Sequence, residues 1–130
     1  MITAYLTAIS SVMEGEDLEV RYSIYEDQNF LRKDTVILDY QKPAIAGHAA
    51  LMTMIEILDE YPDKKITIYI NDPALNEFIK GTSTTKNKDV LKIGRETRKK
   101  LNKRVNVTVK DIHDDRILLK KWNEELTFNS

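Results

Sequence analysis

The chain has 130 residues, 42% of them hydrophobic and 32% charged, which is enough for one globular domain with a buried core. It contains no cysteine, which excludes disulfides, thiolate metal sites and cysteine nucleophiles. The net charge of −1 by itself points to neither an anionic nor a cationic partner.

Charge is unevenly distributed along the chain. Residues 86–104 include nine basic side chains against Asp89 and Glu96, whereas residues 14–39 include eight acidic side chains against three basic ones. Segments of this kind predict two surfaces of opposite charge.

The start of the sequence has no basic segment followed by an apolar block, so we expect no signal peptide. The longest strongly apolar stretch, residues 49–58, is too short to cross a bilayer. These features predict a cytoplasmic protein without a membrane partner.

Alternating apolar and polar residues predict three strands, at residues 2–8, 18–24 and 30–40. The third strand contains Val36, Ile37 and Leu38, which we expect in the core. Polar turns at residues 14–17 and 26–29 are short connections, so the three strands should form an antiparallel meander.

The rest of the chain predicts four helices and two strands. The helices are expected at residues 44–61, 73–80, 89–103 and 115–126, and the strands at residues 66–70 and 105–109. Pro43 and Pro62 bound the first helix, and Asp72 before Pro73 predicts the N-cap of the second. No repeat or linker interrupts the pattern, so residues 1–130 are predicted to form a single domain.

The last two helices have predictable inner faces. The third helix should bury Val90, Ile93, Gly94, Thr97 and Leu101. The last helix should begin after Asp114 or Asp115 and bury Ile117, Leu118, the stem of Lys121 and Trp122.

This element order resembles the ribonuclease H-like fold, of the ribonuclease H and reverse-transcriptase-associated type, over nearly the whole chain. Ile68 to Asp72, followed by a short helix to Gly81, looks like the family's fourth strand, and the helix with Ala50, Leu51 and Met52 looks like its first helix. The resemblance implies an α/β fold with a mixed five-stranded sheet, antiparallel in the meander and then parallel, with helices on both faces.

Active members of that family cut the RNA strand of an RNA–DNA hybrid with two Mg²⁺ ions held by about four carboxylates. Here the end of the first strand reads Thr7-Ala8-Ile9-Ser10-Ser11, the first helix reads His48-Ala49-Ala50-Leu51, and the last helix has Leu118 and Leu119 at the matching level. Only Asp72 matches a carboxylate of the family, which implies a degenerate active site.

Three groups of polar residues have both a functional and a structural interpretation. Asp72 is either a metal ligand kept from the family or only a helix cap. His48 is either a metal ligand or a partly buried histidine. His113, Asp114 and Asp115 either form a weak cation site with Asp72 or are a loop and a cap.

The basic segment predicts a possible binding surface, which we call the basic stripe. Its residues recur on one helix face, opposite the buried one: Lys88, Lys92, Arg95, Lys99 and Lys103. Such a row of cations can follow a phosphate backbone, so a hybrid or duplex is a candidate partner, although the stripe has no aromatic residue for stacking on bases. A charged helix face that only keeps the protein soluble is the alternative.

The acidic meander predicts another kind of contact. Its outer face carries Glu19, Arg21 and Glu26, and it could meet the basic stripe of a second copy in a homodimer or a larger assembly.

Three functional hypotheses follow. The first is a non-catalytic ribonuclease H-like module that binds nucleic acid or acts as a scaffold through the basic stripe, without a cofactor. The second is a nuclease dependent on Mg²⁺ or Mn²⁺, with a rearranged site made from Asp72, Asp115, Asp111 and Glu14. The third is a self-associating structural protein. The sequence leaves enzymatic activity open.

Overall fold

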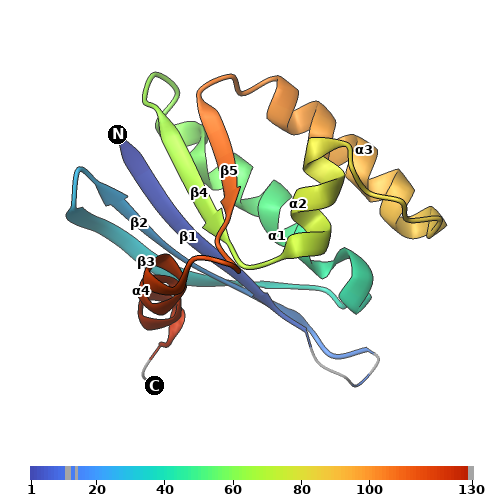
Figure 1. Ribbon diagram of the computed structural model, residues 1–130. Helices are drawn as coiled ribbons and strands as arrows, with labels where there is room; N and C mark the ends of the chain where they lie inside the picture. Colours follow the sequence, from blue (N-terminus) through green and yellow to red (C-terminus); the bar gives the residue numbers. More distant parts are fainter. Residues whose placement is uncertain (11–12, 14, 129–130) are drawn as a thin grey trace.

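The computed structural model describes residues 1–10, 13 and 15–128. Its strands are β1 (Ile2–Ile9), β2 (Leu18–Glu26), β3 (Asn29–Leu38), β4 (Ile66–Ile70) and β5 (Val107–Asp111). Its helices are α1 (Pro43–Ile57), a 3-10 turn (Leu58–Glu60), α2 (Pro73–Lys80), α3 (Lys88–Asn102) and α4 (Arg116–Leu126). Figure 1 shows this chain as one sheet with helices on both sides.

The five strands form one mixed sheet in the order β3-β2-β1-β4-β5. β1 pairs antiparallel with β2 and β2 with β3, whereas β1 pairs parallel with β4 and β4 with β5. This confirms the predicted meander followed by parallel strands.

The side chains of the strands alternate between two helix layers. Ile2, Ala4 and Leu6 of β1 are buried on the face covered by α1, and α3 packs against α1 in the same layer. On the other face, α4 packs on β1 and β2 (Figure 1). The core therefore lies mainly between the sheet and α1.

Several elements begin and end where the local chemistry predicts. The Asp72 carboxylate caps α2 by accepting the Leu75 N–H, and Gly81 ends α2 in the left-handed conformation at φ 78°. Asp115 caps α4 by accepting the Leu118 N–H, so of the two predicted caps Asp115 is the right one. The expected turn at residues 14–17 includes Glu14, which lies outside the described residues.

Two predicted core positions and one predicted strand start are wrong. Ile37 is 59% exposed, because on edge strand β3 it lies on the face opposite Val36 and Leu38. Val105 is 96% exposed, because it precedes β5 instead of beginning it. Ile117 is 84% exposed, because α4 turns the positions of Trp122, Glu125 and Leu126 toward the sheet.

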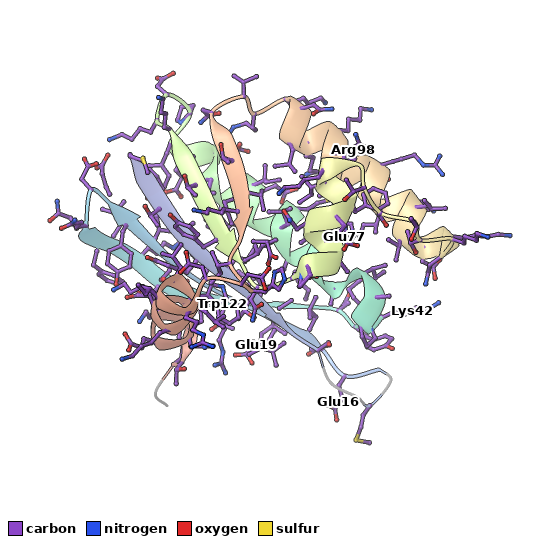
Figure 2. The ribbon with its side chains drawn as sticks, in the orientation of Figure 1. Glu16, Glu19, Lys42, Glu77, Arg98 and Trp122 are labelled. Atoms are coloured by element: carbon purple, nitrogen blue, oxygen red, sulfur yellow. The ribbon has the colours of Figure 1, made fainter. Side chains whose placement is uncertain are left out.

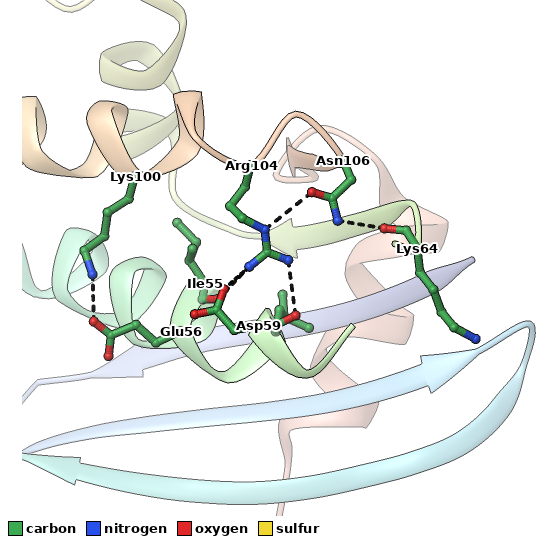
Figure 3. A network of polar contacts seen from close by, with 8 residues as sticks. Ile55, Glu56, Asp59, Lys64, Lys100, Arg104 and Asn106 are labelled. Carbon is green, nitrogen blue, oxygen red and sulfur yellow. Dashed lines mark hydrogen bonds and ion pairs between the residues drawn. The ribbon is translucent and has the colours of Figure 1, made fainter. Parts of the chain in front are cut away.

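Arg104 joins the end of α3 to the end of α1. Its guanidinium donates to the main-chain oxygens of Ile55 and Leu58 at 3.4 and 3.2 Å and pairs with Asp59 (Figure 3). The last carbonyls of a helix have no partner within the helix, so Arg104 caps α1 from another element. Beside it, the more exposed Lys100 pairs with Glu56 at 2.7 Å.

No helix in the described part of the chain is long and apolar enough to span a membrane.

Candidate functional site

A pocket of about 120 Å³ lies at the carboxyl ends of β1 and β4, where the two helix layers meet. Strand ends, the first turns of α1 and α2, and α4 line it: Leu6, Thr7, Ala8, Ser10, Pro43, Ala46, Gly47, Ala50, Ile70, Asn71, Asp72, Leu75 and Trp122. We call it the central pocket. Carboxyl ends of parallel strands are a common place for ligand sites in α/β proteins.

Asp72 is the carboxylate that lines the central pocket, and both of its side-chain oxygens have a structural role. Oδ1 accepts the Leu75 N–H at 3.1 Å, while the Asp72 N–H donates to Asp111 Oδ1 at 2.9 Å. Oδ2 lies against the Cα of Gly47, where any larger side chain would collide with it. The cap predicted from the sequence is therefore present, and the second oxygen is packed against α1.

The β1 and α1 walls of the central pocket are small and uncharged. β1 and the residue after it contribute Thr7, Ala8 and Ser10, and α1 contributes Ala46, Gly47 and Ala50. Ala8 and Ala50 thus do line the site, as the resemblance implied.

Trp122 closes the central pocket from the side of α4. Its indole N–H donates to the main-chain oxygen of Leu6 at 3.0 Å, and Figure 2 labels it between α4 and the sheet. The resemblance put Leu118 and Leu119 level with the family's carboxylate in the last helix. The residue of α4 that lines the pocket is Trp122, about one turn later.

Asp111 is hydrogen-bonded to Asp72, but neither Asp111 nor Asp115 is among the residues that line the central pocket. Asp111, at the end of β5, pairs through Oδ2 with His113, and His113 Nε2 lies 3.1 Å from Asp114 Oδ2. Asp115 is engaged as the cap of α4. Glu14 lies outside the described residues.

These donors do not fit a pair of Mg²⁺ ions. Two metals that flank one phosphate need several oxygen ligands that converge on them. Among the described residues no three His, Asp or Glu side chains are grouped so that they could hold a metal ion. Alanine, glycine and tryptophan residues, which have no side-chain oxygen to bind Mg²⁺, line much of the central pocket.

His48 points away from the central pocket. It is buried, its Nδ1 lies 3.3 Å from Thr97 Oγ1 of α3, and its ring meets Phe78 of α2 edge to face. Burial lowers the pKa of His48, and the charge of Asp72 only partly opposes that effect. His48 is thus a buried histidine between three helices, as its structural interpretation predicted.

The basic stripe lies on the exposed side of α3, and all five of its residues are exposed. Arg98, which the sequence analysis left out, joins it: Arg95, Arg98, Lys99, Asn102 and Lys103 line one shallow groove. Figure 2 shows Arg98 extending from α3. Its spacing of three residues from Arg95 was the signal that could have found it.

The ion pairs of the described residues leave out the cations of the basic stripe. No ion pair found within the described ranges includes Lys88, Lys92, Arg95, Lys99 or Lys103. By contrast, Lys42, Lys64, Lys100, Arg104 and Lys121 each pair with a carboxylate.

Comparison with known proteins gives matches at the level of structure only. No protein-family model and no curated protein matches the sequence. An LC11 ribonuclease H1 isolated from compost by a metagenomic approach superposes with a TM-score of 0.74 at 15% identity, over 96% of this chain and 94% of that one. Ribonuclease H1 from the halophilic archaeon Halobacterium salinarum NRC-1 gives a TM-score of 0.71 at 13% identity, over 95% and 92% of the two chains.

A further structure is that of LC11 ribonuclease H1 in complex with an RNA/DNA hybrid. It gives a TM-score of 0.72 at 16% identity, over 97% of this chain and 96% of that one. At these identities the likeness shows the fold. The chain is an α/β protein with a ribonuclease H-like fold, as its element order implied.

Proposed function

We propose that this protein is a non-catalytic ribonuclease H-like domain that binds an RNA–DNA hybrid or another duplex through the basic stripe of α3. The observation that carries the proposal is the row of exposed cations on one face of α3, none of which belongs to an ion pair found in the described structure. Unpaired cations in a row attract a phosphate backbone and release its counterions on binding.

The solved hybrid complex of a structural neighbour supports this choice of partner. The central pocket supports the non-catalytic part, because its described walls supply Asp72 but not the further carboxylates that two metal ions need.

The test is a salt titration of binding to a labelled hybrid and to a labelled duplex. Affinity should fall steeply with salt. The slope of the logarithm of the binding constant against the logarithm of the salt concentration should become shallower by about one unit for each phosphate contact removed, as in Arg95→Ala and Lys99→Ala. Lys100→Ala is the matched control, because it removes the same charge from the same helix at a residue paired with Glu56. Binding that is undetectable or insensitive to salt contradicts the proposal.

The same samples test the nuclease alternative. Incubation with Mg²⁺ or Mn²⁺ should leave the hybrid intact. Cleavage that is lost in Asp72→Asn would instead establish a metal-dependent nuclease with a rearranged site. A dimer in solution that covers the stripe would favour the structural hypothesis.

A further inference from the structure

The sheet face that carries α4 has two neighbouring rows of side chains, set by strand register. The first row runs from β3 to β5 through Lys33, Ser23, Tyr5, Tyr69 and Lys110. The second row runs in the same direction through Phe30, Tyr25, Thr3, Thr67 and Thr108. Paired residues of neighbouring strands lie on the same face, so aromatic, hydroxyl and ammonium groups gather here.

Four rings in these rows touch one another in the spatial order of the strands. Phe30 meets Tyr25 edge to face at 5.7 Å, and Tyr25 meets Tyr5 edge to face at 6.2 Å. Tyr5 stacks on Tyr69 with ring centres 5.5 Å apart. The four rings form a continuous strip across β3, β2, β1 and β4, which we call the aromatic strip.

α4 covers only part of this face. Lys121 and Glu125 of α4 reach Tyr25, and Tyr5 is buried beneath them. In Figure 1, β4 and β5 have no helix in front of them on this side. Phe30 is 57% exposed, Tyr25 and Tyr69 are half-buried, and Lys110 is exposed.

A groove of about 350 Å³ lies beside the middle of the aromatic strip, between its two more open ends at Phe30 and Tyr69. Thr3, Tyr5, Tyr25, Gln28 and Lys121 line it, so rings, hydroxyl, amide and ammonium groups all border one space. A groove with apolar walls and a few polar groups is typical of a ligand site.

The charge around the aromatic strip complements phosphate. Lys33 and Lys110 stand at the two ends of the first row, and neither belongs to an ion pair found in the described structure. Glu125, the nearby carboxylate, already accepts the Tyr25 O–H at 2.7 Å and pairs with Lys121 at 3.0 Å. Lys33 and Lys110 are thus the cations of this face that remain available to a phosphate.

We propose that this open face binds single-stranded nucleic acid, with bases stacked on Phe30 and Tyr69 and phosphate held by Lys110. Rings accept the flat face of an unpaired base, which a duplex hides within its own stack. The basic stripe lies in the α1 and α3 layer on the other side of the sheet, so this surface is separate from the one proposed for duplexes.

The experiment measures binding of a labelled oligothymidylate of roughly a dozen nucleotides by fluorescence anisotropy. Tyr69→Ala and Phe30→Ala should each weaken binding about tenfold, and Tyr69→Phe should bind like the original chain because the ring remains. Lys110→Ala should weaken binding and lower its salt dependence, whereas Lys100→Ala on α3, where the lysine is paired with Glu56, should change neither. Lys99→Ala is measured as well.

Because Tyr69 stacks on buried Tyr5, Tyr69→Leu is measured alongside, with circular dichroism and thermal melting on every variant. It keeps apolar volume next to Tyr5 but has no ring, so weaker binding by a folded Tyr69→Leu chain supports the proposal. Unchanged binding by folded Tyr69→Leu and Phe30→Ala chains overturns it, as does a lack of binding.

Two other results would also overturn the proposal. One is loss of single-strand binding in Lys99→Ala, which would move the contact to α3. The other is a dimer that Phe30→Ala dissociates, which would make a second copy the occupant of this face. Duplex binding by the same variants is measured in parallel, so failure of this surface and failure of the basic stripe are distinguishable.

Discussion

The carboxylate of Asp72 occupies the space that a side chain at Gly47 would need. One oxygen caps α2 and the other is packed against the first turns of α1, so the two residues fix the distance between α1 and the end of β4. Glycine is required here by close approach and not by an unusual backbone angle.

We predict that Gly47→Ala lowers the free energy of unfolding by about 1–3 kcal/mol, because the new methyl group overpacks this contact. Urea unfolding measures the change. In an Asp72→Ala background the obstacle is gone, so Gly47→Ala should instead stabilise, since alanine favours a helix over glycine by about 1 kcal/mol. An equal loss of stability in both backgrounds would show that Asp72 is not the obstacle.

Comparison of Asp72→Asn with Asp72→Ala distinguishes the contribution of the α2 cap to stability from that of the negative charge. Asparagine keeps an oxygen that can accept the Leu75 N–H, so this variant should stay close to the original stability, whereas alanine should lose about 1 kcal/mol. The comparison uses the midpoints of urea unfolding. Similar losses in both variants would point to the negative charge as the important feature.

His48 should make the protein sensitive to mild acid. Its pKa is lowered in the fold, so the unfolded chain takes up a proton more readily as the pH falls below about 6.5, and stability should then decrease. Unfolding free energies measured along a pH series test this. His48→Leu should remove the decrease in that window, and a decrease that persists unchanged would assign it to another group.

Tyr25 and Glu125 hold α4 on the sheet. Burial would raise the pKa of Glu125, but the Tyr25 hydrogen bond and Lys121 together hold it below 4.5, so the ionised carboxylate stabilises the fold above that pH. Burial and the same hydrogen bond raise the pKa of Tyr25 to about 12. The stability contributed by Glu125 should therefore decrease as the pH drops below 4.5. The stability contributed by Tyr25 should decrease as the pH rises from 10.0 toward 12.

We therefore expect Tyr25→Phe to lower the free energy of unfolding by about 1.5–3 kcal/mol at neutral pH, as for loss of a hydrogen bond to a charged group. The variant should also lose less stability than the original chain at acidic and at alkaline pH. Urea unfolding at neutral, acidic and alkaline pH provides the measurement. Tyr69→Phe is the control, because it removes the same atom where no hydrogen bond to a described residue is found. Equal effects of the two changes would disprove the role of the Glu125 contact.

Arg104 should contribute more to stability than the neighbouring Lys100. Its guanidinium binds two helix-end carbonyls and a carboxylate, and it is 14% exposed, whereas Lys100 forms one pair at the surface (Figure 3). Arg104→Ala should lower the unfolding free energy by about 2–3 kcal/mol and Lys100→Ala by less than about 1 kcal/mol. Thermal and urea unfolding of both variants test the difference, and comparable losses would contradict it.

The order and type of the elements could be read from the sequence, because apolar periodicity and end signals are local. The alternation of Leu18, Val20 and Tyr22, the boundary at Pro43 and the cap at Asp72 depend on a few neighbouring residues each. The charged stripe of α3 was predictable for the same reason, since helical spacing places its members on one face.

The tertiary structure alone decided which side chains meet. Trp122 and Leu6 are 116 positions apart, and nothing local indicates that this indole, and not Leu118 or Leu119, would face the central pocket. Val36 and Ile37 are adjacent and similar, yet Val36 is half-buried and Ile37 is exposed. The reason is that they lie on opposite faces of the edge strand β3.

The aromatic strip shows the same division between sequence and structure. Each ring is an ordinary strand residue in the sequence, and strand register joins Phe30, Tyr25, Tyr5 and Tyr69 into one surface. The sequence by itself thus determined the elements and the basic helix face, because those depend on contacts within a few residues. The pocket walls, the buried partners of Asp72 and the open aromatic face depend on how distant segments pack, which only the folded chain decides.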